Sequence, residues 1–144
     1  MNKAVMIAAM MCAAWSAHAD VKMNGLFTDH MVLQRDIPVA VLGTAEPGET
    51  VTVTFAGQSK PTTADKDGRW SVKLDALQAS TNSAAMTIEG KNTITLNDIV
   101  IGDVWVCGGQ SNMAMGLSGC DRPEDIQTAE IPLLRQFHSP GLVA

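Results

Sequence analysis

The chain has 144 residues, with 10 Lys and Arg against 15 Asp and Glu, and a formal net charge of −5. This length suits one domain of about 100–150 residues together with part of a second. No basic run is present to hold a phosphate backbone, so the composition excludes nucleic acid as a partner. Neither His30 nor His138 has a second His or a Cys at zinc-ligand spacing, so no metal site is expected.

The first nineteen residues are typical of an export signal. Lys3 gives a positive start, residues 4–15 are apolar and uncharged, and Ala17 and Ala19 are small residues at a cleavage position. The apolar run is shorter than the roughly 18–20 residues that a membrane span requires. We therefore expect a cleaved signal peptide, a periplasmic or secreted chain, and no membrane attachment after cleavage.

Residues 21–101 show the pattern of β-structure. Short runs rich in β-branched and aromatic residues partly alternate apolar with polar, and turn residues separate them. Thr52 and Thr54 are expected to face water, opposite an apolar face. The pattern predicts an antiparallel β-sandwich over residues 20–98. The predicted strands are residues 39–42, 50–55, 70–74, 85–89 and 93–96, with turns at 46–49, 56–58 and 90–92 and a hairpin loop at 65–69.

The periodicity changes after Asn97. Residues 99–107 are apolar with little alternation, which indicates a strand buried on both faces, and Gly108 and Gly109 follow as a turn. Helices are expected at 111–117 and 123–130, and a strand at 133–137. Residues 99–144 are therefore predicted to be the incomplete first βαβ portion of an α/β domain, which indicates a fragment.

Two cysteines remain after signal cleavage, Cys107 and Cys120. In an oxidising compartment they could pair, although two isolated thiols do not form a disulfide framework. The alternative is that Cys107 packs as a small apolar side chain at the end of the predicted buried strand. The sequence leaves both open.

Ser111 is the candidate nucleophile. A strand that stops at a tight glycine turn and starts a helix with serine presents the hydroxyl at a sheet edge, near the first amides of the helix. Such amides can stabilise the oxyanion that forms when a serine oxygen attacks an acyl carbon. The alternative is an ordinary strand-to-helix turn in which Ser111 is the N-cap.

Five blocks of the chain form an ordered set of motifs: residues 25–35 (GLFTDHMVLQR), 37–39 (IPV), 43–48 (GTAEPG), 102–113 (GDVWVCGGQSNM) and 131–138 (IPLLRQFH). The residue that follows Ser111 by two places is Met113, whereas the commoner α/β-hydrolase elbow has glycine there. In this order the blocks resemble the sialate O-acetylesterase family, a branch of the SGNH hydrolases that acts on acetylated sugars.

The resemblance implies an SGNH-type hydrolase domain after the β-sandwich, with Ser111 as catalytic residue. Gly109, Gln110 and Asn112 would bind substrate or hold the oxyanion, an O-acetylated sugar would be the substrate, and no cofactor or metal is implied. The residues alone leave Gln110 open as a loop hydrogen bond and Asn112 as a solvent-facing residue.

The family's general base lies in an Asp-x-x-His block that this chain lacks. His138 is the only histidine after Ser111, and we expect it to be an ordinary strand residue. Because a serine needs such a base, the chain alone is predicted to be inactive.

Two acidic positions are assigned structural roles. Asp103 is expected to cap the turn at the strand entry. For Asp29 and His30 the family resemblance implies a structural role between strands of the β-domain. The alternative function is a non-catalytic, exported β-sandwich module that binds a glycan or a protein. The sequence leaves the oligomeric state open.

Overall fold

The computed structural model describes residues 20–119, 121 and 123–138. The expected export signal, residues 1–19, and Cys120 lie outside the described residues. Among the residues described, none of the helices has the length and hydropathy of a membrane span.

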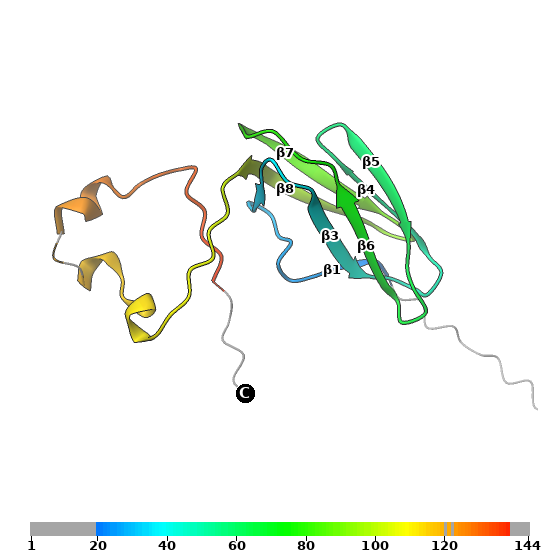
Figure 1. Ribbon diagram of the computed structural model, residues 1–144, viewed down its shortest axis with the longest axis horizontal. Coiled ribbons are helices and arrows are strands. Elements are labelled where there is room, and N and C mark those ends of the chain that lie inside the picture. The colour runs from blue at the N-terminus through cyan, green and yellow to red at the C-terminus, as the bar shows by residue number, and fades with distance from the viewer. Residues whose placement is uncertain (1–19, 120, 122, 139–144) are drawn as a thin grey trace, which may run out of the picture.

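Two β-sheets, one of three strands and one of five, lie face to face and form the first part of the chain (Figure 1). Their strand orders are β1-β3-β6 and β2-β8-β7-β4-β5. Only short 3-10 helices are described after them, so the prediction of a mostly-β chain is confirmed. The elements are β1 (Lys22–Met23), β2 (Val32–Gln34), β3 (Val39–Thr44), β4 (Thr50–Phe55), β5 (Gln58–Thr63), β6 (Arg69–Leu74), β7 (Ser80–Glu89), β8 (Thr93–Gly102), η1 (Ser111–Ala114), η2 (Leu117–Gly119) and η3 (Pro123–Thr128).

We call residues 20–102 the β-domain and residues 103–138 the C-terminal segment. The hydrophobic core of the β-domain takes side chains from both sheets. Along β4 the alternation follows the prediction, because Thr54 is exposed and Thr52 half-buried while the residues between and beside them are buried. Every buried hydrophobic residue in the described part of the chain lies between positions 21 and 100. The largest fully buried side chains are Phe55, Leu74, Met86, Ile88 and Ile99.

All five strands predicted in the β-domain are present, but β1, β2 and β5 were not predicted. β1 and β2 are too short to show a period, and β5 (QSKPTT) has no apolar alternation. β2 also runs parallel to β8, so the five-stranded sheet is mixed rather than antiparallel. β1 and β2 belong to different sheets, so no hairpin joins them. The connection between them therefore allows β2 to run parallel to β8.

The loop at residues 65–69 is not the predicted hairpin loop, since it joins β5 to β6 in the other sheet. Its turn chemistry is as expected, with Gly68 at φ 73°. The carboxylate of Asp65 accepts the backbone N–H groups of Asp67 and Arg69, both at 2.9 Å. The hydrogen bond from Arg69 is the main cause that lowers the pKa of Asp65.

β5 forms one edge of the five-stranded sheet, and Lys60 and Pro61 lie on it. A two-residue turn joins it to β4, with φ of 47° at Ala56 and 78° at Gly57, which is the sign pattern of a type I′ turn. Hydrogen-bonded and non-hydrogen-bonded pairs alternate outward from such a turn. Pro61 pairs with Thr52 at a non-hydrogen-bonded position, so its nitrogen faces away from β4.

The predicted βαβ unit is wrong for the described residues. β8 runs unbroken from Thr93 to Gly102, so residues 99–102 end a β-domain strand instead of starting a new one. Residues 103–109 and 133–137 form no strand, and the predicted helices are the short elements η1, η2 and η3. A strand buried on both faces needs neighbouring strands, and short helices are marginal without packing. The division of the chain at residues 98 and 99 stays a prediction, although the sheet itself continues to Gly102.

Candidate functional site

Ser111 is the first residue of η1 and is exposed. The N-cap is Gln110, which has extended backbone angles (φ −97°, ψ −157°) and makes no side-chain capping hydrogen bond. The interpretation of Ser111 as an N-cap is therefore wrong. The turn is held by its backbone, where the N–H of Met113 donates to the carbonyl of Gln110 at 2.9 Å. The hydroxyl of Ser111 thus lies outside the core.

The other predicted site residues, Gly109, Gln110 and Asn112, lie beside Ser111 and are exposed as well. Gly109 is packed closely, because a Cβ built on it would lie 2.9 Å from Cγ of Met113. Within the described residues, no hydrogen bond joins Ser111 to a histidine or a carboxylate. His138 is exposed near the end of the described chain. The predicted site residues are therefore neighbours because they are consecutive in the chain, and no described histidine or carboxylate binds the Ser111 hydroxyl as a general base would.

The apolar residues before this turn are exposed, contrary to the prediction of a buried strand. Trp105 is 84% exposed and Val106 96% exposed. Cys107 is an exposed free thiol and does not pack as a buried apolar residue. No neighbouring strand covers them among the residues that the structure describes, which accounts for the failed prediction.

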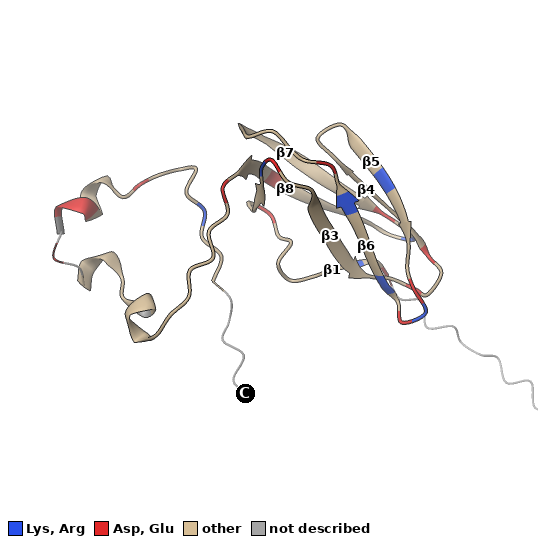
Figure 2. Cartoon of the chain, viewed as in Figure 1, with Lys and Arg blue, Asp and Glu red and all other residues tan. Residues whose placement is uncertain are grey.

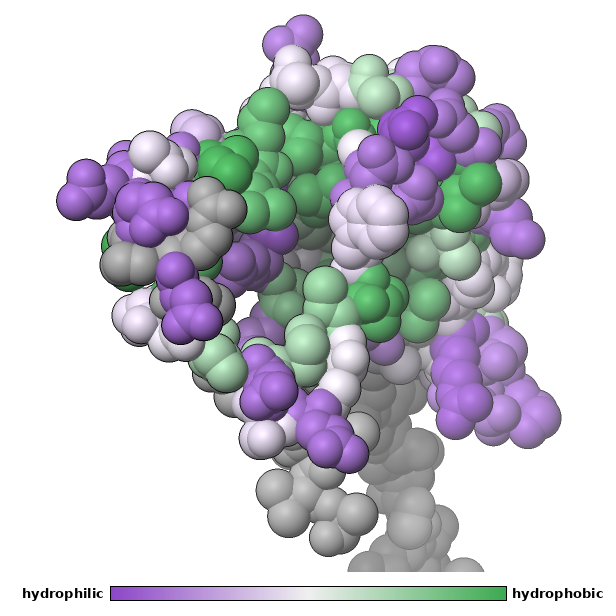
Figure 3. Space-filling view, turned by 60° about the vertical axis from the view of Figure 1, so that its left-hand side comes forward, coloured by the Kyte–Doolittle hydropathy of each residue, from purple (hydrophilic) through white to green (hydrophobic). Residues whose placement is uncertain are grey.

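An open groove of about 1680 Å³ lies between the C-terminal segment and the β2–β8 edge of the β-domain. Apolar side chains line much of it, including Val100, Trp105, Met113, Leu134 and Phe137. Figure 3, turned to bring the C-terminal segment forward, shows apolar residues gathered at the surface around this hollow. Ser111 is not among the lining residues, although Met113 in the same turn is.

Asp103 forms an ion pair where the C-terminal segment leaves the β-domain. Nε of Arg35 donates to Asp103 at 2.9 Å, and an Nη donates to Asp36 at 2.6 Å. The hydrogen bond with Asp103 is the main cause that raises the pKa of Arg35. The side chain of Gln34 accepts the N–H of Val104 at 2.8 Å. Asp103 therefore stabilises the strand end through Arg35, whereas the sequence predicted that it would cap a turn.

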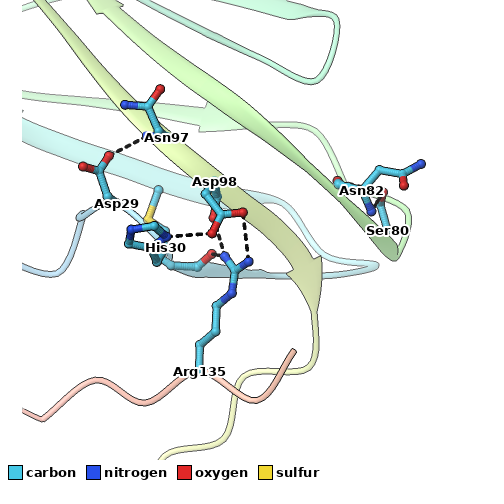
Figure 4. A network of polar contacts seen from close by, with 8 residues as sticks. Asp29, His30, Ser80, Asn82, Asn97, Asp98 and Arg135 are labelled. Atoms are coloured by element: carbon cyan, nitrogen blue, oxygen red, sulfur yellow. Dashed lines mark hydrogen bonds and ion pairs between the residues drawn. The ribbon is translucent and has the colours of Figure 1, made fainter. Parts of the chain in front are cut away.

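A second polar cluster connects the loop before β2 to β8 (Figure 4). Nδ1 of His30 lies 2.6 Å from a carboxylate oxygen of Asp98, and Asp29 accepts the N–H of Asn97 at 2.5 Å. These contacts give Asp29 and His30 the connecting role that the sequence predicted. Arg135, which the sequence did not single out, reaches the same carboxylate from the C-terminal segment.

Three oxygens of the β-domain surround the Arg135 guanidinium (Figure 4). One Nη donates to the backbone carbonyls of Asp98 and Met31, the latter at 3.3 Å, and the other donates to the Asp98 carboxylate at 3.1 Å. The side chain of Arg135 is only 16% exposed. No local sequence signal pairs Arg135 with Asp98, since they are 37 positions apart.

The carboxylate of Asp98 is expected to stay ionised to a lower pH than an ordinary aspartate. The hydrogen bond with His30, then those with Ser83 and Arg135, lower the pKa of Asp98 from 3.8 to about 2. A lowered folded-state pKa stabilises the fold above pH about 4, and this contribution is lost as the pH falls toward 2. A ¹³C NMR titration of the Asp98 carboxyl carbon should give a midpoint near 2, and His30→Ala should move it upward. A wild-type midpoint at 3.8 would contradict the cluster.

The charged side chains and the possible metal ligands of the described residues form no second site. Figure 2 shows Lys and Arg separated from one another and interspersed with Asp and Glu. The part of the chain that the structure describes contains no group of three or more His, Cys, Asp or Glu that could hold a metal ion.

Comparison with curated proteins identifies the family. The chain is 37% identical to the sialate O-acetylesterase of Mus musculus over 114 residues, which are 72% of this chain and 21% of that protein. It is 38% identical to the Homo sapiens sialate O-acetylesterase over 111 residues, 69% of this chain and 21% of that protein. The chain belongs to the sialate O-acetylesterase family.

A solved structure agrees with this assignment. The crystal structure of a carbohydrate acetylesterase from Xanthomonas citri matches with a TM-score of 0.72 and 31% identity, over 78% of this chain and 26% of that one. No protein-family model matches the chain. This sialate O-acetylesterase family sequence thus spans about a fifth of the length of the curated relatives it matches. The family resemblance is confirmed, while the roles of Ser111 and its neighbours stay predictions.

Proposed function

We propose that the chain is part of an exported carbohydrate esterase that removes O-acetyl groups from sialic acid or a related sugar, with Ser111 as the nucleophile. The observation that supports this most is its 37–38% identity to two proteins named sialate O-acetylesterase. The exposed position of Ser111, directly after Gly108, Gly109 and Gln110, is compatible with attack on a substrate. Export rests on the signal pattern in residues 1–19.

The proposed reaction has two steps. A general base takes the proton of the Ser111 hydroxyl as Oγ attacks the acetyl carbonyl carbon. The tetrahedral intermediate collapses as the bond to the sugar oxygen breaks, and the base passes that proton to the sugar oxygen. The acetyl group then resides on Ser111 until water hydrolyses it to acetate. The amides of Gly109 and Ser111, with the side chains of Gln110 and Asn112, would hold the negative oxygen of each intermediate.

The chemistry also needs a base. The described residues place no histidine on the Ser111 hydroxyl, so the serine would have to attack with its proton still bound. Loss of one such catalytic element costs orders of magnitude in rate. We therefore expect the chain to need an Asp-x-x-His segment of the kind that the family resemblance implies.

Hydrolysis of 4-nitrophenyl acetate tests the proposal. The 144-residue chain should be nearly inert, and a version extended through an Asp-x-x-His segment should turn over. In that version Ser111→Ala should lower kcat by about 10⁴-fold or more, because the nucleophile is lost. Ser118→Ala is the matched control, since Ser118 is an exposed serine of η2 and should keep full activity. Activity that survives Ser111→Ala would refute Ser111 as the nucleophile.

A non-catalytic binding module is the second candidate. The observation that favours it is that the hydrophobic core lies in the β-domain and takes no buried residue from the described part of the C-terminal segment. Such a module would keep its binding of acetylated sugar when the C-terminal segment is removed, whereas the esterase would not keep its activity.

A further inference from the structure

The C-terminal segment leaves the β-domain and returns to the same edge of it. Figure 1 shows the chain running outward after β8, through η1, η2 and η3, and back toward the end of β8. The outgoing chain follows Gly102, and the returning chain places Arg135 on Asp98, which belongs to the same strand. Residues 103–135 are therefore a loop with both ends on the β2–β8 edge.

The outgoing end of this loop is fixed by three contacts to the end of β2. The N–H of Arg35 donates to the carbonyl of Gly102 at 2.9 Å, which continues the β2–β8 pairing. Arg35 also binds the Asp103 carboxylate, and Gln34 accepts the N–H of Val104. Backbone and side chain together thus set the direction in which the chain departs.

In the described structure, the hydrogen bonds and ion pair that join the returning end to the β-domain come from Arg135. Arg135 donates to the Asp98 carboxylate and to two backbone carbonyls, those of Asp98 and Met31. Asp98 has φ of 54° and His30 has φ of 63°, so both residues of the His30–Asp98 ion pair have left-handed backbone conformations. A planar guanidinium can serve these oxygens from two nitrogens, which a lysine ammonium cannot reproduce.

We propose that Arg135 is a positioning residue, which closes residues 103–135 into a loop on the β-domain and thereby holds the Ser111 turn in place. His30 supports it by binding the second oxygen of Asp98, which orients the carboxylate. The entropic cost of closing a flexible loop grows only slowly with its length, so one well-bound arginine can close this one. The consequence for catalysis rests on the proposed function, but the closure of the loop does not.

Backbone ¹⁵N order parameters of the chain from residue 20 onward test the closure without any activity. In the wild type, the described residues between 104 and 134 should have values above about 0.6, and Arg135→Gln should lower them below about 0.6 while the β-domain stays near 0.85. Arg135→Lys keeps the charge but loses the planar fork, so it should restore only part of the order. Asp98→Asn is compatible with the left-handed conformation and should lower the order less, because the two carbonyls remain.

Lys60→Gln is the matched control, because it removes the exposed Lys60–Asp75 ion pair (2.7 Å) within the β-domain. It should leave the described residues between 104 and 134 unchanged. Unchanged order parameters in Arg135→Gln would overturn the proposal, and so would a wild-type segment already below about 0.6.

Measurements of kcat and KM then distinguish the positioning role of Arg135 from the role of Ser111 as the nucleophile. In the version extended through the Asp-x-x-His segment, Arg135→Gln should lower kcat about tenfold to a hundredfold with little change in KM, and Arg135→Lys should recover part of it. If Ser111→Ala abolishes activity but Arg135→Gln does not change kcat, the positioning role fails alone. If Ser111→Ala has no effect while Arg135→Gln loosens the loop, the nucleophile assignment fails and the closure stands.

Discussion

A fragment of residues 20–102 is expected to fold cooperatively, whereas a fragment of residues 20–98 is expected to be unfolded in water. The shorter fragment loses Ile99 and Val100, which are 0% and 5% exposed, and the β8 residues that pair with β2. Truncating one buried Ile to Ala already costs about 2–5 kcal/mol. Losing both residues and the β2 pairing should remove more than about 5 kcal/mol, which is the whole stability of a marginal domain.

Urea titration followed by Trp70 fluorescence measures this difference. Trp70 is the only tryptophan of residues 20–102 and is buried, so its emission should shift to the red on unfolding. The chain from residue 20 to 144 serves as the control, and its midpoint by circular dichroism should be close to that of fragment 20–102. Equal midpoints for the two fragments would show that the β-domain ends before Ile99.

Gly43→Ala is expected to have the second largest effect on stability. A Cβ at this position of β3 would lie 2.1 Å from the carbonyl oxygen of Lys22 and 2.7 Å from Cζ2 of Trp70. Neither neighbour can move freely, since Lys22 is paired within the sheet through β1 and Trp70 is buried in the core. Overpacking of this kind costs about 1–3 kcal/mol.

The control for this substitution is Gly25→Ala, because nothing lies within 4 Å of a Cβ built on Gly25. Its effect should stay within about 0.5 kcal/mol. For Gly43→Ala we expect a lower urea midpoint with an unchanged slope, which indicates lost stability and not a change in the unfolded state. A midpoint equal to that of the wild type would mean that β1 does not pair with β3 in solution.

Much of the β-domain could be predicted because its signal is local. β4 alternates β-branched residues with threonine, and its predicted bounds are the observed ones. β5 has no such pattern, since its place depends on pairing with β4 and on the turn at Ala56 and Gly57. An apolar run shows only that a strand could be buried, whereas burial itself depends on neighbouring strands. For this reason residues 99–102 lie in the core or at its border while Trp105 and Val106 are exposed.

The candidate site also contains residues that the sequence could predict and residues that it could not. Ser111 and its neighbours form a contiguous motif, so the amino-acid sequence by itself points to them. Arg135 and Asp98 meet only because the C-terminal segment returns to β8, and no spacing rule relates two positions 37 residues apart. The ion pair of Arg35 with Asp103 is likewise set by the parallel pairing of β2 with β8, which the sequence did not predict.

The proline of β5 has a consequence for crowded solutions of the protein. An unpaired outer strand normally offers alternating donors and acceptors to which a strand of another molecule can add, and repeated addition leads to fibrils. Pro61 removes one of these outward donors, so the row of donors along β5 is interrupted. Concentrated protein should therefore resist templated aggregation along this side.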